Sequence, residues 1–264
     1  MNARDATRPR QNTATAGSRE RKDADTIADL GLLVPNIELA TGCNPAHMPG
    51  NPPSTLAQSL TQRLLTLLRI TDLIPLSALE IYTPESLKPV TESDADEEDA
   101  TEQEAEAEVK AFWTLYIDIL IISLDGSAFD AAWGATLASL RSTLLPAAWW
   151  DPNPDSVVCD PRVEKATKLD IRGFPIALSF GVFKPTNEGN NETTRKKGMY
   201  VLADPDDFEE SCCEGSVTVV VDDGGKRVWR VELGGTTLVQ PSMLRELVQR
   251  TGERWTEWKG VLEA

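Results

Sequence analysis

Carboxylates dominate the side chains that could do chemistry in this sequence. Clustered carboxylates can bind Mg²⁺ and support phosphoryl chemistry. One dense run of acids lies over residues 204–210. Neighbours along the chain do not by themselves surround an ion, so this run also fits a strand end followed by a capped helical turn. The helix dipole would stabilise the acids of such a turn. We favour that second interpretation and expect neither a metal nor a cofactor. The acids of this run are Asp204, Asp206, Asp207, Glu209 and Glu210.

A second candidate site lies at Asp125, Gly126 and Ser127, where an apolar strand is expected to lead into a helix. Free backbone N–H groups at a helix N-terminus form a natural anion site. Here Asp125 and Asp130 place negative charge at its mouth, and the next Arg or Lys in the sequence is Arg141. Like charge and missing donors argue against phosphate. A turn, a cap and a packing helix are therefore the simpler interpretation.

Histidine and cysteine offer little support for catalysis. The only histidine, His47, lies in a loop rich in Pro and Gly, and no G-x-S-x-G elbow supplies the nucleophile that a hydrolytic triad would need. The cysteines have neither zinc nor disulfide spacing, because Cys212 and Cys213 are adjacent. We expect free thiols in a reducing, intracellular compartment.

The charge is strongly negative and unevenly placed. The formal net charge of the 264 residues is -16, and residues 91–108 hold ten acids and no base, which predicts a solvated acidic loop. A body this acidic repels phosphate, so autonomous, non-specific nucleic-acid binding is not expected. The compact basic cluster Arg195, Lys196 and Lys197 could contact an RNA backbone, or could simply be solvated.

The elements that must position these groups follow from hydrophobic patterning. Residues 1–27 are polar without periodicity and are expected to form a disordered tail. We expect amphipathic helices over 55–70, from 127 and from Pro241, and strands over 112–124, 169–183, 217–221 and 227–233. Interleaved strands, hairpins and helices predict an α+β fold. The longest apolar stretch, 111–124, contains Asp118 and is too short to span a bilayer.

Five segments, in order, resemble the RNase PH-like proteins of the RNA exosome ring. Each is weak alone, but their order is specific. They are residues 52–64, 111–132, 171–177, 202–210 and 217–222. The resemblance covers residues 28–264 and implies one RNase PH-like domain with a fold like that of ribosomal protein S5 domain 2, interrupted by the acidic loop.

The resemblance also implies a function. Ring subunits of this kind assemble with one another and with S1/KH-type cap subunits, and the ring threads RNA to a separate nuclease for 3′-to-5′ processing and decay, including ribosomal RNA maturation. Such an assembly is nuclear and nucleolar, and also cytoplasmic. Partners would be other ring subunits, cap subunits and RNA, with no membrane.

Active members of the family phosphorolyse RNA, holding phosphate with Arg and Ser/Thr at a Gly-rich turn beside a catalytic acid. At the matching positions this sequence has Asp125, Gly126 and Ser127 without the Arg, and Asp204 is the candidate acid. The resemblance therefore implies a degenerate, non-catalytic site. It also implies strands before Leu30 that the polar segment does not supply, as in a truncated gene model or a variant lacking them. An active phosphorolytic exoribonuclease and an acidic interaction protein unrelated to RNA remain alternatives.

Overall fold

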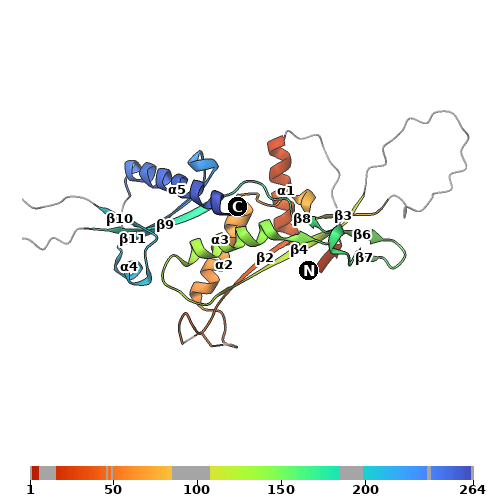
Figure 1. The fold of residues 1–264 in the computed structure, drawn as a ribbon, viewed down its shortest axis with the longest axis horizontal. Helices are drawn as coiled ribbons and strands as arrows, with labels where there is room; N and C mark the ends of the chain where they lie inside the picture. The colour runs from red at the N-terminus through yellow and green to blue at the C-terminus, as the bar shows by residue number, and fades with distance from the viewer. Residues whose placement is uncertain are drawn as a thin grey trace, which may run out of the picture. The chain divides into compact units, whose positions relative to one another are not determined.

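The computed structural model describes residues 2–5, 16–45, 47–48, 50–84, 108–184, 199–236 and 239–262 (Figure 1). The chain divides into two compact units. Unit 1 comprises Met1–Val34, Ile74–Tyr116 and Arg141–Ile171, and unit 2 comprises Pro35–Leu73, Ile117–Leu140 and Arg172–Ala264. The acidic run over residues 91–107 and the basic cluster Arg195, Lys196 and Lys197 lie outside the described residues.

The first sheet is built around one long strand. Its order is β1–β4–β2, and β3 also pairs with β4. The pairings of β4 with β1 and with β3 are antiparallel. Apolar side chains of β4 such as Phe112 and Leu115 are buried in unit 1. The strands are β1 (Asn2–Asp5), β2 (Leu33–Leu39), β3 (Glu80–Tyr82) and β4 (Val109–Ile121).

The N-terminal segment differs from its sequence interpretation. A disordered tail was expected over residues 1–27, whereas the structure places β1 and most of helix α1 (Ala16–Leu30) in that range. Helix α1 contacts the 3-10 turn η1 (Leu76–Ala78). Ile27 near its end is 5% exposed. The helix was missed because its large apolar residues, Ile27 and Leu30, lie only in its last turns, and the preceding residues are mostly small, polar or charged.

The apolar run after the acidic segment is a strand, as predicted, but only its first half is buried. Beyond Leu115 the side chains alternate, and Leu120 is 60% exposed. A continuous apolar run over residues 112–124 is typical of a buried strand, and that expectation is wrong for this second half. An apolar run does not itself reveal how many faces of the strand are covered.

Unit 1 also holds one small hairpin and one further pair of short strands. The Asp160 carboxylate accepts hydrogen bonds from Arg162 and pairs with Lys165, and these contacts hold the pKa of Asp160 well below its usual range. One hairpin joins β6 (Ala148–Asp151) to β7 (Ser156–Cys159). Two further short strands, β5 (Leu144–Leu145) and β8 (Thr167–Lys168), pair antiparallel, and the β6–β7 hairpin and the turn η3 (Val163–Lys165) lie between them in the chain.

The sheet of unit 2 positions the candidate site. Its antiparallel strand order is β10–β9–β11–β12, and helix α5 (Pro241–Leu262) packs along one face (Figure 1). On that face lies an apolar cluster of Phe180, Val182, Val217, Val219, Val221 and Leu247. The strands are β9 (Ile176–Phe183), β10 (Tyr200–Ala203), β11 (Gly215–Asp222) and β12 (Arg227–Gly235), and the turn η5 (Asp223–Gly225) joins the last two.

Because successive strand residues face opposite sides, the neighbours of these apolar residues point the other way. Ser179 and Thr218 bond there to residues of helices α2 (Thr55–Ile70) and α3 (Ala128–Ser142). Helix α2 confirms the prediction over 55–70. Ser54 caps it by accepting a hydrogen bond from the Ala57 amide. Among the described residues no helix combines the length and the hydropathy needed to cross a membrane.

Candidate functional site

The turn before α3 fits closely against the turn after β10, within unit 2. Gly126 has a φ of 78°, and a Cβ there would lie 2.1 Å from the Pro205 carbonyl oxygen. Ser127 also has a positive φ, 43°, and is 8% exposed. A non-glycine residue in this region of φ is strained and is held there by its surroundings. The Gly-Ser pair therefore seats the start of α3 on a neighbouring loop.

Both donors of Ser127 are satisfied by the protein itself. Its backbone amide donates to Glu210 Oε1 at 2.8 Å, and its hydroxyl donates to the Pro205 carbonyl oxygen at 3.4 Å. Glu210 belongs to the short helix α4 (Asp207–Cys212), which begins with a capping box between Asp206 and Glu209. An internal carboxylate thus lies at the N-terminus of α3, where a bound anion would otherwise be favoured.

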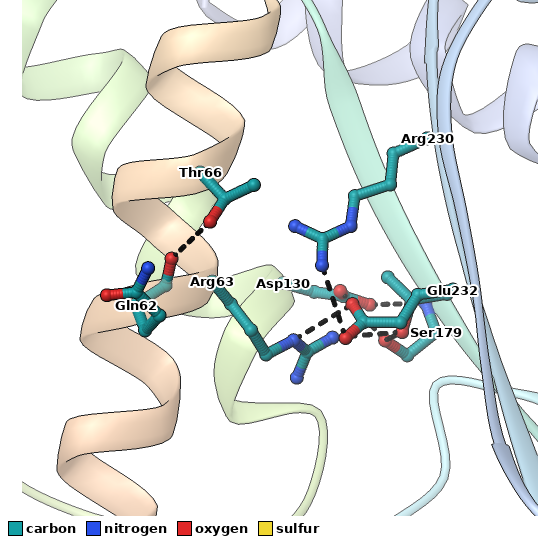
Figure 2. A network of polar contacts seen from close by, with 8 residues as sticks. Gln62, Arg63, Thr66, Asp130, Ser179, Arg230 and Glu232 are labelled. Atoms are coloured by element: carbon teal, nitrogen blue, oxygen red, sulfur yellow. Dashed lines mark hydrogen bonds and ion pairs between the residues drawn. The ribbon is translucent and has the colours of Figure 1, made fainter. Parts of the chain in front are cut away.

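Asp130, in the first turn of α3, joins the helix to the sheet (Figure 2). Its carboxylate accepts hydrogen bonds from the Ser179 amide at 2.5 Å and from the Ser179 hydroxyl at 3.0 Å. Burial raises the pKa of Asp130 to about 6, against the lowering effect of Ser179 and of the Arg63 charge. The nearby charge of Asp204 raises it further. The group therefore titrates close to neutral pH.

A second polar contact joins α2 to the same face of the sheet. Arg63 Nε donates to Glu232 Oε2 at 3.0 Å, and an Arg63 Nη donates to Thr218 Oγ1 at 3.2 Å. Its guanidinium also lies 4.1 Å from the centre of the Phe129 ring. Figure 2 shows Arg230 on the opposite side of Glu232, where it pairs at 3.4 Å. The Thr218 and Ser179 hydroxyls, 2.9 Å apart, connect this contact to Asp130.

The structure brings three of the predicted site residues together. Gly126 and Ser127 lie against the turn that follows Asp204, whose amide donates to the Ser179 carbonyl oxygen at 2.9 Å. Asp204 is exposed and has a φ of 54°. Asp125 is exposed just before the same turn. The expected capped acidic turn is confirmed as α4.

Sequence reasoning missed the two arginines, Arg63 and Arg254, that lie near Asp130. Arg63 and Arg254 are far from Ser127 in the sequence, so a search among neighbours found no base. Arg254 lines a cavity with Ser127 and Asp130. The sequence signal that could have located the polar contacts of the sheet was a polar residue inside an apolar strand. Ser179 lies between Leu178 and Phe180, and Thr218 lies between two valines.

The other candidates do not form a site in the part of the chain that the structure covers. No three side chains of His, Cys, Asp or Glu among the described residues are placed to hold a metal ion. The four cysteines are free. His47 lies in its expected loop, where its amide donates to the Asn44 carbonyl oxygen.

Two family models match the chain. Residues 12–146 match the 3′ exoribonuclease family, domain 1, and residues 173–248 match the 3′ exoribonuclease family, domain 2. The first match begins upstream of the expected domain start at residue 28. Gly126, Ser127 and Asp130 fall within the first match, and Asp204 and Glu210 fall within the second.

The sequence is also similar to two curated exosome components. Exosome complex component rrp43 of Schizosaccharomyces pombe is 32% identical over 221 residues, covering 83% of this chain and 65% of that protein. Exosome complex component Rrp42 of Thermococcus gammatolerans is 22% identical over 199 residues, covering 75% and 57%. The chain therefore spans less than two thirds of the length of these curated relatives.

A solved structure, the Archaeoglobus fulgidus exosome with RNA bound to the active site, has a TM-score of 0.55 to this chain at 21% identity. The match covers 85% of this chain and 69% of that one. It establishes a shared RNase PH-like fold, in agreement with the α+β prediction.

Proposed function

We propose a structural, non-catalytic role for this chain, which belongs to the 3′ exoribonuclease family. In this role the chain completes the ring of an RNA exosome and supports 3′-to-5′ RNA processing and decay, including ribosomal RNA maturation. Its partners would be other RNase PH-like ring subunits, S1/KH-type cap subunits and RNA. The names of its relatives, exosome complex components, support this assignment.

The contact between Glu210 and Ser127 is the observation that carries the non-catalytic part. Phosphorolysis needs a phosphate held by donors close to the scissile bond. Here the Ser127 amide and hydroxyl are both engaged within the protein, and the group on the amide is itself an anion. A phosphate would have to displace that carboxylate and approach the additional charges of Asp130 and Asp204.

Active phosphorolysis is the second candidate, because Ser127 and Asp204 keep an alcohol and an acid near the α3 N-terminus. It would require Glu210 to withdraw and a cation to take its place. Arg254, which lines the neighbouring cavity, pairs with Glu257 at 2.9 Å. That pairing and the surrounding acids favour the structural role.

We propose that the basic cluster Arg195, Lys196 and Lys197 contacts RNA. This cluster lies shortly before Asp204 in the sequence. Contacts of this kind add electrostatic affinity without sequence specificity. We expect the proposed assembly in the nucleus and nucleolus, and also in the cytoplasm.

Affinity purification of the full chain from a cell extract, followed by mass identification of the co-purifying proteins, tests the assembly. We expect other RNase PH-like subunits and S1/KH-type subunits in amounts comparable to the chain. Recovery of the chain without any such subunit would overturn the proposal in favour of an acidic interaction protein unrelated to RNA. A tagged, unrelated acidic protein of similar charge serves as the control for non-specific capture.

A further inference from the structure

A cavity of about 200 Å³ lies in unit 2 between α3, β9 and the second half of α5. Trp133 of α3 and Trp258 of α5 contribute aromatic walls, and Ile176 and Leu178 contribute aliphatic ones. Trp258 stands close to α3, because a Cβ on Gly134 would lie 2.8 Å from its ring. The proposed structural role leaves this cavity without an assigned occupant.

The polar lining of the cavity is acidic. Asp130 and Asp204 contribute carboxylates, and the pKa of Asp130 is raised mainly by burial, with a smaller increase from the charge of Asp204. Arg254 is the cation of the lining, and its charge is offset by Glu257 at 2.9 Å. The acids of α4 lie just beyond, with Glu210 on the Ser127 amide. This electrostatic field repels phosphate and nucleic acid and attracts cations.

We propose that this cavity binds a basic side chain, an arginine or a lysine, presented by a partner protein. The cationic group would lie against Asp130 and Asp204, and the aliphatic stem would cover the indole rings of Trp133 and Trp258. Indole faces attract cations and apolar stems alike. Charge complementarity favours this occupant over RNA. The inference rests on the proposed non-catalytic role, because the cavity must be free of phosphate and RNA.

Titration of the full chain with N-acetyl-arginine amide, followed by the indole N–H resonances in NMR spectra, tests this proposal. The Trp258 resonance is assigned with a Trp258→Phe variant. N-acetyl-citrulline amide is the neutral, nearly isosteric control. We expect a saturable shift of the Trp258 resonance with the arginine probe and at least about fivefold weaker binding of the citrulline probe.

Two variants test whether the carboxylate of Asp204 binds the cationic group of the probe. Asp204 is exposed, so Asp204→Asn should preserve the fold while weakening the arginine probe at least about threefold. Asp207→Asn, an exposed acid of α4 outside the cavity lining, should leave the affinity unchanged. Equal weakening by the two variants would overturn the proposal, because it would show a general surface charge rather than a pocket.

The remaining outcomes distinguish a failure of the cation pocket from a failure of the proposed non-catalytic role. Equal binding of the arginine and citrulline probes, or no binding of either, would overturn the cation pocket and leave the structural role standing. A saturable Trp258 shift with adenosine monophosphate in place of the arginine probe would overturn the pocket in favour of nucleic acid. Binding of inorganic phosphate that Ser127→Ala weakens would overturn both.

Discussion

The Ser127 amide donates its hydrogen bond to the Glu210 carboxylate, which lies 83 residues further along the chain. This contact ties the first residue before α3 to the short helix α4 and gives the helix N-terminus a permanent counter-charge. A capping residue normally comes from the same turn of the chain. Here tertiary structure supplies the anion, and in the proposed role the same contact both stabilises the fold and opposes phosphate binding.

Substitution of Glu210 should therefore cost stability. We expect Glu210→Ala to lower the free energy of unfolding by about 1 kcal/mol, because it leaves the buried Ser127 amide without its acceptor. Glu210→Gln keeps an acceptor oxygen and should lose less. Urea unfolding followed by circular dichroism measures both. Asp125→Ala, at an exposed acid of the same turn, is the matched control, and an equal loss there would contradict the specific role of Glu210.

The raised pKa of Asp130 predicts a pH dependence. The pKa of an Asp in the unfolded chain is near 3.8, and burial raises the pKa of Asp130 in the folded protein to about 6, so ionisation of Asp130 opposes folding. Below about pH 4 both states are protonated and there is no penalty. The penalty grows between about pH 4 and 6 and is complete above that range.

Asp130→Asn removes this titration. Its stability relative to wild type should rise by about 2 kcal/mol between about pH 4 and pH 7. The asparagine can still accept from the Ser179 amide, so the fold should persist. Urea unfolding of both proteins across this pH range gives the difference directly. A difference independent of pH would show that Asp130 is not the titrating group.

The stability of the fold should depend on the shape of the Arg63 side chain as well as on its charge. Arg63→Ala loses the bonds to Glu232 and Thr218 and the contact with the Phe129 ring, and we expect a loss of about 2 kcal/mol. Arg63→Lys keeps the charge but not the planar fork, so it should recover only part of the loss. Thermal or urea unfolding ranks the variants. Arg69→Ala, at an exposed position of the same helix, should change stability by less than about 0.5 kcal/mol.

A methyl group at Gly126 should disrupt the site more than any surface change. The Cβ of Gly126→Ala would lie 2.1 Å from the Pro205 carbonyl oxygen, and the φ of 78° is unfavourable for alanine. We expect a loss of about 3 kcal/mol or failure to fold. Gly260→Ala, in α5 with open space around its Cβ, should be neutral or slightly stabilising. Comparable losses in the two variants would contradict the close fit at Gly126.

Hydrophobic patterning predicted the main elements because their burial follows a regular period. Ser54 and the leucines of α2 define a cap and one apolar stripe, and the β-branched run of β11 defines a covered strand. Helix α1 has only two large apolar residues, Ile27 and Leu30, and the strands of the β6–β7 hairpin are only four residues long. Their positions depend on contacts with distant segments, which one sequence does not reveal.

The site was predicted in part for the same reason. Gly126 and Ser127 mark a turn that local chemistry can identify, and Asp206 and Glu209 mark a capping box. Glu210 belongs to the same acidic run, but its hydrogen bond to Ser127 joins two segments that only the fold brings together. The pairing of Arg63 with Glu232 is equally non-local, spanning 169 residues.

In the proposed structural role, this chain does not phosphorolyse RNA. The most direct measurement is the phosphate-dependent release of nucleoside diphosphates from RNA, with the purified chain and with its affinity-purified complex. The chain alone should release none, and Asp204→Asn should leave any activity of the complex unchanged. Phosphate-dependent release by the wild-type chain that Asp204→Asn abolishes would contradict the account.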